Sequence, residues 1–207
     1  MARQKYGAVV FDLLTALLDS WSLWNEVAGS ESLGLAWRTR YLVLTYEAGA
    51  YRSYEGVIRE SARDAGVAPE RVDALIRRWG DVKPWPETRE VVSTLMAKVP
   101  VAVASNASIA LARIAVGALG VAVATVVTAE EAGFYKPRPE PYRMALEWLG
   151  CRPESTLFVA GSAVDVPGAS AVGMPVFWHN RRRLPAAPGG VQPLYVSDSL
   201  RPLLDLV

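Results

Sequence analysis

The 207-residue chain has a single cysteine, Cys151, and no long uncharged apolar segment. One cysteine excludes an internal disulfide and is typical of a reducing compartment. No uncharged apolar run approaches the roughly 20 residues that a membrane-spanning helix needs. The apolar stretch behind the basic start of the chain ends at Asp12, which is too early for a secretory signal. We therefore expect a cytoplasmic protein that does not use a membrane as partner.

The chain also lacks excess charge, because it has 22 basic and 21 acidic residues and a net charge of +1. This balance gives no overall attraction to nucleic acid, so none is expected as partner. The segment 181–190, RRRLPAAPGG, is basic only locally and predicts a solvated loop. Lysine is scarce, with Lys136 one of only four. A lysine inside a motif is therefore better explained by a functional role than by a random surface charge.

Hydrophobic residues make up 51% of the chain, which is enough for a sizeable core. Five short apolar runs are continuous rather than alternating, as expected of strands buried on both faces of a parallel sheet. These runs are 8–11, 99–104, 122–127, 156–160 and 175–178. Helical patterns lie between them at 87–98, 107–119, 139–149 and 164–172. The alternation predicts an α/β protein with a Rossmann-like open parallel sheet and helices on both faces.

The stretch from Leu17 to Lys83 breaks this alternation, because it contains no convincing strand. It predicts helices at 20–28, 33–48, 54–65 and 69–79, and Pro84-Trp85-Pro86 then ends the helical run. We expect a core domain of residues 1–16 and 84–207 with an inserted all-helical cap at 17–83. The insert carries four of the seven tryptophans. They form either the wall of an apolar pocket or the packing of a small helical lobe.

Polar residues follow four of the predicted strands. They are Asp12 after the first, Ser105 and Asn106 after the second, Lys136 after the third, and Ser162 and Asp165 after the fourth. Ligands of open α/β sheets bind beyond the carboxyl ends of the strands, so these groups should converge at one edge. A single Asp after a strand is usually a turn or helix cap. Four such positions in order predict a functional site instead.

This order resembles the haloacid dehalogenase superfamily, whose four motifs match the strand ends and whose cap matches the insert. Three segments resemble its L-2-haloacid dehalogenase branch. They are FDLLTALLDS at the first strand, WRTRYLVLTY in the insert, and KPRPEPY after the third strand. Dimers are common in that branch, so the sequence is compatible with a homodimer.

The resemblance implies that Asp12 is the nucleophile, attacking an electrophilic carbon to form an ester that water hydrolyses. Lys136 and Asp165 would complete the catalytic set. Lys136 would offset the repulsion between Asp12 and an anionic substrate, and Asp165 would orient Lys136 or activate water. The residues expected to bind a small anionic substrate are Arg38, Ser105, Asn106, Thr15, Tyr142 and Ser162. For the arginine position in the insert, Arg40 competes with Arg38.

Two positions depart from the superfamily's phosphatases. Leu14 stands where those enzymes have an acid that protonates the leaving alcohol, and Gly161 stands where they have a magnesium ligand. Magnesium requires oxygen ligands, so we expect neither a metal nor another cofactor. The chain departs from the dehalogenases as well. Leu14-Thr15-Ala16 replaces Tyr-Gly-Thr, and Ala160 and Ser162 replace Ser and Asn, which predicts an altered substrate pocket.

The sequence thus favours a hydrolase that acts at carbon through an aspartyl ester on Asp12. The expected substrate is a small 2-haloalkanoic acid, converted to a 2-hydroxy acid and halide. A strained cyclic amino acid such as azetidine-2-carboxylate could be opened in the same way. Two alternatives stay open: a magnesium-dependent phosphatase, which Leu14 and Gly161 disfavour, and a non-catalytic binding protein on the same fold.

Overall fold

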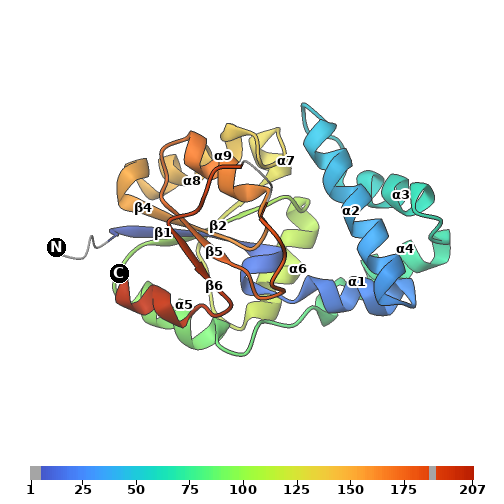
Figure 1. Cartoon of the computed structure of the whole chain (residues 1–207), viewed down its shortest axis with the longest axis horizontal. Helices are drawn as coiled ribbons and strands as arrows, with labels where there is room; N and C mark the ends of the chain where they lie inside the picture. The colour runs from blue at the N-terminus through green and yellow to red at the C-terminus, as the bar shows by residue number, and fades with distance from the viewer. Residues whose placement is uncertain (1–5, 187–189) are drawn as a thin grey trace.

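A six-stranded parallel sheet forms the centre of the molecule, in the order β3-β2-β1-β4-β5-β6 (Figure 1). The computed structural model describes residues 6–186 and 190–207, so residues 187–189 of the predicted basic loop lie outside the described residues. The strands are β1 (Ala8–Asp12), β2 (Val101–Ser105), β3 (Thr125–Thr128), β4 (Thr156–Ala160), β5 (Val176–His179) and β6 (Tyr195–Ser197). The fold class predicted from the sequence is confirmed.

Two strands differ most from the sequence prediction, since β1, β2 and β5 are shifted by only one or two residues. β3 begins at Thr125 rather than at residue 122, and Thr125 pairs with Ala102 at the first position of the β2–β3 ladder. β6 was not predicted. It has only three residues, pairs with β5 alone and lies at the edge of the sheet, where its side chains are half-buried or exposed. Such a strand has no continuous apolar run to indicate it.

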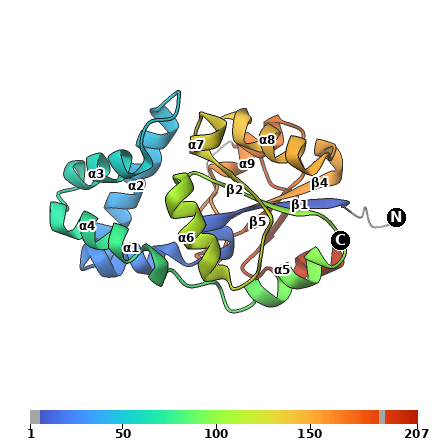
Figure 2. The ribbon, with the colours of Figure 1, turned by 180° about the vertical axis from the view of Figure 1, so that it is seen from behind.

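Helices cover both faces of the sheet (Figure 2). Alternate residues of each strand point to opposite faces, so Val9 and Phe11 pack against one set of helices and Val10 against the other. The first face carries α5 (Thr88–Met96) and α6 (Ile109–Leu119). The second carries α8 (Pro139–Leu149) and α9 (Asp165–Ala171), with the short α7 (Ala129–Ala132) preceding α8. Burial on both sides explains why these strands are apolar throughout.

The predicted insert folds as four helices beside the carboxyl ends of the strands (Figure 1). They are α1 (Ser20–Ala28), α2 (Glu31–Glu47), α3 (Tyr54–Asp64) and α4 (Pro69–Arg77). Asp19, Ser30 and Ser53 accept hydrogen bonds from the first turns of α1, α2 and α3, and each therefore fixes where its helix begins. Trp24 and Trp37 pack with ring centroids 4.7 Å apart inside this unit. None of the described helices is long and apolar enough to cross a membrane.

The chain enters and leaves the insert at one place. Leu18 forms an antiparallel bridge with Pro84, and the backbone N–H of Asp19 donates to the carbonyl of Lys83 over 2.7 Å. The two connecting segments therefore lie side by side, as in a two-stranded hinge. We propose on this basis that residues 17–83 form a cap domain and that residues 1–16 and 84–207 form the core domain.

Candidate active site

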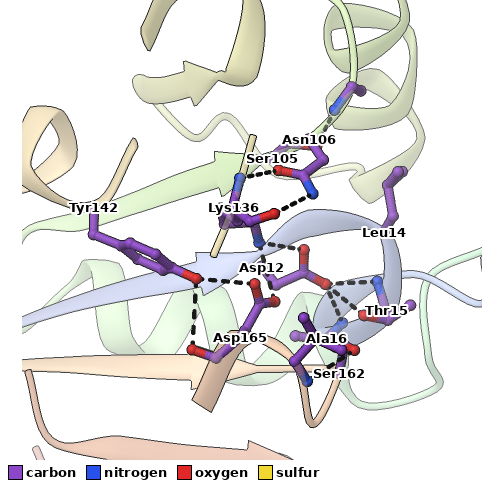
Figure 3. A network of polar contacts seen from close by, with 12 residues as sticks. Asp12, Leu14, Thr15, Ala16, Ser105, Asn106, Lys136, Tyr142, Ser162 and Asp165 are labelled. Carbon is purple, nitrogen blue, oxygen red and sulfur yellow. Dashed lines mark hydrogen bonds and ion pairs between the residues drawn. The ribbon is translucent and has the colours of Figure 1, made fainter. Parts of the chain in front are cut away.

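Asp12, the last residue of β1, is oriented by the π-helical turn that follows it, Leu13–Leu17, which we call the Asp12 turn. Its Oδ2 accepts three hydrogen bonds: from the backbone N–H of Thr15 (2.9 Å), the Thr15 hydroxyl (2.6 Å) and the backbone N–H of Ala16 (3.1 Å) (Figure 3). Oδ1 faces Lys136 instead. One carboxylate oxygen is thus fixed by the turn and the other faces the site.

The carbonyl oxygens of the Asp12 turn also have hydrogen-bond partners. Four side chains donate to them at 2.5–3.1 Å: Ser20 to Leu14, Trp85 to Thr15, His179 to Ala16 and Thr88 to Leu17. For His179, the carbonyl acceptor requires that Nδ1 carries the hydrogen. Since a single-turn π-helix is irregular backbone, these donors from α1, α5, β5 and the hinge define its geometry. Sequence reasoning found none of the four.

Lys136 lies between two carboxylates (Figure 3). Its Nζ is 2.8 Å from Asp12 Oδ1 and 3.1 Å from Asp165 Oδ2, and its side chain is only 2% exposed. Asn106 fixes the lysine backbone from both sides, because its Oδ1 accepts from the Lys136 N–H (2.8 Å) and its Nδ2 donates to the Lys136 carbonyl (3.2 Å). The amide of Asn106 is therefore committed to positioning Lys136.

These three buried groups shift one another's pKa values. Burial alone raises the pKa of Asp12, but the Lys136 ammonium and the Thr15 hydrogen bonds outweigh burial, so the pKa lies below its usual range. Burial raises the pKa of Asp165, and the nearby Asp12 charge adds to this rise. Burial opposes the charge of Lys136, yet the two carboxylates raise its pKa above the ordinary value. Asp12 is thus held ionised, and Asp165 is the carboxylate that takes up a proton more readily.

Tyr142 lies behind Asp165 rather than beside the open space of the site. Its hydroxyl donates to Asp165 Oδ1 over 3.0 Å, and its ring packs edge-on against Phe158. Burial and the Asp165 charge raise the pKa of Tyr142 well above its usual range, so it remains a neutral donor. Tyr142 therefore supports Asp165 and does not occupy the position expected of a substrate ligand.

Arg38 reaches the site from α2. Its guanidinium lies 4.1 Å from the centroid of the Trp21 ring, and its Nη1 donates to the Ser20 hydroxyl over 2.9 Å. The competing Arg40 points outward, where it pairs with Asp64 at 2.7 Å on the exposed face of the insert. Of the two arginines in the motif, only Arg38 faces Asp12 across the site.

A small cavity of about 50 Å³ lies between Asp12 and Arg38. The core contributes Asp12, Leu14, Thr15, Asn106, Lys136, Ser162 and Asp165 to its lining, and the helical insert contributes Trp21, Trp24, Arg38, Tyr41, Leu42 and Tyr54. Both interpretations of the tryptophan-rich insert apply. Trp21 and Trp24 line the cavity and Trp37 packs inside the insert. Trp79 packs against Tyr54 and donates to the Leu111 carbonyl of α6. The two tyrosines gave no signal in the sequence. Ser105 does not line the cavity, since it is fully buried and its hydroxyl accepts from the Ala107 N–H.

The residues do not fit a magnesium ion. A Cβ at Gly161 would stand 2.2 Å from the Ala16 nitrogen and 2.3 Å from Thr15, so no acidic side chain fits there against this backbone. The two remaining carboxylates, Asp12 and Asp165, already share the Lys136 ammonium. Among the residues that the structure describes, no group of three His, Cys, Asp or Glu side chains is placed to hold a metal. The cation that both of these carboxylates contact is the Lys136 ammonium.

Comparison with known proteins places this arrangement in a family. A family model described as haloacid dehalogenase-like hydrolase matches residues 7–173. The match spans most of the chain, so the protein belongs to the haloacid dehalogenase-like hydrolases. A structure of L-2-haloacid dehalogenase from Xanthobacter autotrophicus shares the fold with a TM-score of 0.85 at 21% identity, covering 97% of this chain and 98% of that one.

The chain falls among distant relatives of the L-2-haloacid dehalogenases, as its motifs indicated. The (S)-2-haloacid dehalogenase 2 of Pseudomonas sp. (strain CBS-3) is 28% identical over 99% of this chain and 96% of its own length. A phosphoserine phosphatase of Thermus thermophilus is 30% identical over 84% of this chain and 74% of its own. The choice between these activities therefore depends on the residues of the site.

Proposed function

We propose that the protein hydrolyses a small 2-haloalkanoic acid to the 2-hydroxy acid and halide, through an ester on Asp12. One observation carries this proposal: a carboxylate held ionised, with one oxygen fixed by three donors and the other directed at a small cavity that a buried arginine closes. A fixed carboxylate with a free face is a nucleophile for saturated carbon. The small cavity volume favours a substrate of a few heavy atoms.

The charges in the cavity favour an anionic substrate. The site has two carboxylates, Asp12 and Asp165, and two cations, Lys136 and Arg38, so its net charge is zero. Lys136 contacts both carboxylates, however, and no described carboxylate lies within ion-pair distance of Arg38. A buried arginine without a counter-charge is costly. Within the described residues, Arg38 Nε and the hydroxyl of Tyr54 are buried without a hydrogen-bond partner, and both residues line the cavity. A bound anion satisfies both donors.

The reaction proceeds in two steps. In the first, Oδ1 of Asp12 attacks C2, the carbon–halogen bond breaks, and the halide leaves with its electron pair toward Arg38 and Tyr54. In the second, water attacks the ester carbonyl carbon of Asp12 and gives a proton to Asp165. The negative charge of the tetrahedral intermediate forms on Oδ2, where the Thr15 and Ala16 N–H groups already donate. The bond between the acyl carbon and Oδ1 then breaks, and Asp165 returns its proton to the departing oxygen. The 2-hydroxy acid leaves, and the carboxyl group of Asp12 releases its remaining proton to solvent.

A single turnover in oxygen-18 water tests this proposal. With enzyme in excess over L-2-chloropropionate, we expect chloride release and one oxygen-18 atom in the peptide that contains Asp12, with unlabelled product. Asp12→Asn removes both signals. Asp19→Asn is the matched control, since Asp19 caps α1 and does not line the cavity. Neither label nor halide from 2-chloro-, 2-bromo- or 2-fluoro-acids would refute the proposal.

The phosphatase alternative has one observation in its favour, the 30% identity to phosphoserine phosphatase. Against it stand Leu14, a hydrocarbon side chain facing the cavity where a proton donor is needed, and Gly161, which leaves no space for a metal ligand. Hydrolysis of phosphoserine measured with and without magnesium distinguishes the two. Magnesium-stimulated turnover that Asp12→Asn abolishes would replace the dehalogenase assignment.

A further inference from the structure

Ser20, the first residue of α1, joins the helical insert to the Asp12 turn. Its hydroxyl donates to the Leu14 carbonyl over 2.5 Å and accepts from Arg38 Nη1 over 2.9 Å. The direction of both bonds is fixed, because a carbonyl only accepts and a guanidinium only donates. The Ser20 side chain is buried and has no partner in the described structure besides these two.

The chain of hydrogen bonds continues beyond Leu14. The Leu14 carbonyl and the Thr15 N–H belong to one peptide group, and this N–H donates to Asp12 Oδ2 over 2.9 Å. Each donor in such a chain polarises the next group, so the bonds strengthen one another. An unbroken path therefore runs from the Arg38 guanidinium through the Ser20 hydroxyl and one peptide group to the carboxylate of Asp12.

We propose that Ser20 is a positioning residue that couples Arg38, on the insert, to Asp12, on the core. Through this path the arginine charge strengthens the Thr15 N–H as a donor to Oδ2, the oxygen that carries the negative charge when the ester is hydrolysed. The path requires that α1 and α2 lie against the Asp12 turn as in this structure, so Oδ2 is fully stabilised only in this arrangement. The kinetic part of this inference rests on the proposed function, and the coupling itself does not.

The coupling is tested on the protein without substrate. Ser20→Thr and Ser20→Val add the same bulk, but only threonine keeps the hydroxyl. We expect the amide proton of Thr15, assigned by NMR in the 22.5 kDa protein, to resonate near its wild-type position in Ser20→Thr and clearly upfield in Ser20→Val. Arg38→Met should move the same signal upfield, although Arg38 does not touch Thr15. Equal Thr15 shifts in the two Ser20 variants overturn the proposal.

The kinetic readout separates positioning from simple stability. With 2-chloropropionate, kcat of Ser20→Thr should exceed that of Ser20→Val by about ten-fold, as expected when one charge-linked hydrogen bond is lost, while their melting temperatures stay close. Equal kcat values overturn the coupling to catalysis. If Ser20→Val does not fold, Ser20→Ala takes its place against Ser20→Thr. A wild-type protein inactive on haloacids refutes the proposed function, and the Thr15 amide shifts still decide the coupling.

Discussion

Removal of the ammonium of Lys136, by Lys136→Met, should destabilise the protein strongly and in a pH-dependent way. Methionine fills a similar volume, so the change leaves two buried carboxylates, Asp12 and Asp165, without their shared counter-charge. Breaking a buried ion pair from one side costs about 3–5 kcal/mol. With a urea m-value of ~2 kcal/mol per M, the unfolding midpoint at pH 7.5 should fall by about 1.5–2.5 M.

The sign of the pH dependence follows from the carboxylates. In the wild type the pKa of Asp12 is lowered, so its contribution to stability is present above the unfolded-state pKa and is lost as pH falls through the folded-state pKa. In Lys136→Met the ammonium is lost while burial and the Thr15 hydrogen bonds remain, and burial, the largest of these effects, raises the folded-state pKa of Asp12. The variant then gains stability as pH falls, by about 1.4 kcal/mol for each unit by which its pKa exceeds the assay pH. The stability gap should therefore narrow between pH 7.5 and pH 5.

Urea titrations of both proteins at pH 7.5, 6 and 5 measure this gap. Lys98→Met is the matched control, because Lys98 is exposed and its Nζ bonds only to the carbonyl of Val207 in the described structure. That control should change stability by no more than about 0.5 kcal/mol. If the Lys136→Met gap is below about 1 kcal/mol, or does not change between pH 7.5 and pH 5, Lys136 is not the shared counter-charge of the two carboxylates.

Three further predictions follow from the same geometry. Gly161→Ala places a Cβ 2.2 Å from a backbone nitrogen of the Asp12 turn and should lower the melting temperature sharply, whereas Gly117→Ala, on an open helix face, should raise it slightly. The pH profile of kcat should fall on the acid side near the raised pKa of Asp165, which takes the proton of the attacking water, and on the alkaline side only above the ordinary lysine pKa, where Lys136 loses its proton. Tyr54→Phe should lower kcat/KM for 2-chloropropionate about ten-fold by removing one donor to the departing halide.

Each of these has an outcome that contradicts it. Gly161→Ala with wild-type stability and activity would mean that the close contact of Gly161 with the turn is not needed. An alkaline limb near pH 8 would show that the carboxylates do not hold Lys136 charged. For Tyr54, the control is Tyr46→Phe, whose side chain is 64% exposed. If both tyrosine variants have the wild-type kcat/KM, the Tyr54 hydroxyl does not contact the departing halide.

The sequence predicted the core of the fold because strands buried on both faces leave uninterrupted apolar runs. It could not predict β6, whose pairing depends on the edge of a sheet already formed. The helices of the insert were predicted to within a few residues, since Asp19 and Ser30 cap them and Gly29 ends α1. The π-helical form of the Asp12 turn was not predicted, because three of the four side chains that donate to its carbonyls lie 70 or more residues away in the chain: Trp85, Thr88 and His179.

The candidate site could be predicted where the topology alone brings residues together. Asp12, Lys136 and Asp165 follow strands of one parallel sheet and therefore meet at its edge. The direction of the side chains could not be predicted from the sequence. Thr15 and Asn106 line the cavity, but their side chains form hydrogen bonds with Asp12 and Lys136. Contacts between the insert and the rest of the site, such as that of Tyr54, depend on how the insert packs against the sheet, and no motif encodes that packing.

Leu14 and Gly161 were two separate departures in the sequence, and the structure makes them parts of one arrangement. The backbone of the Asp12 turn lies so close to Gly161 that neither a carboxylate nor any other side chain fits at position 161. The same turn brings the Thr15 hydroxyl onto Asp12 Oδ2 and directs Leu14 into the cavity. Restoring an acid at position 14 alone would therefore not rebuild a metal site, because the positive charge next to Asp12 is the ammonium of Lys136. We propose that this arrangement, without an acid at positions 14 and 161, suits attack by Asp12 on carbon.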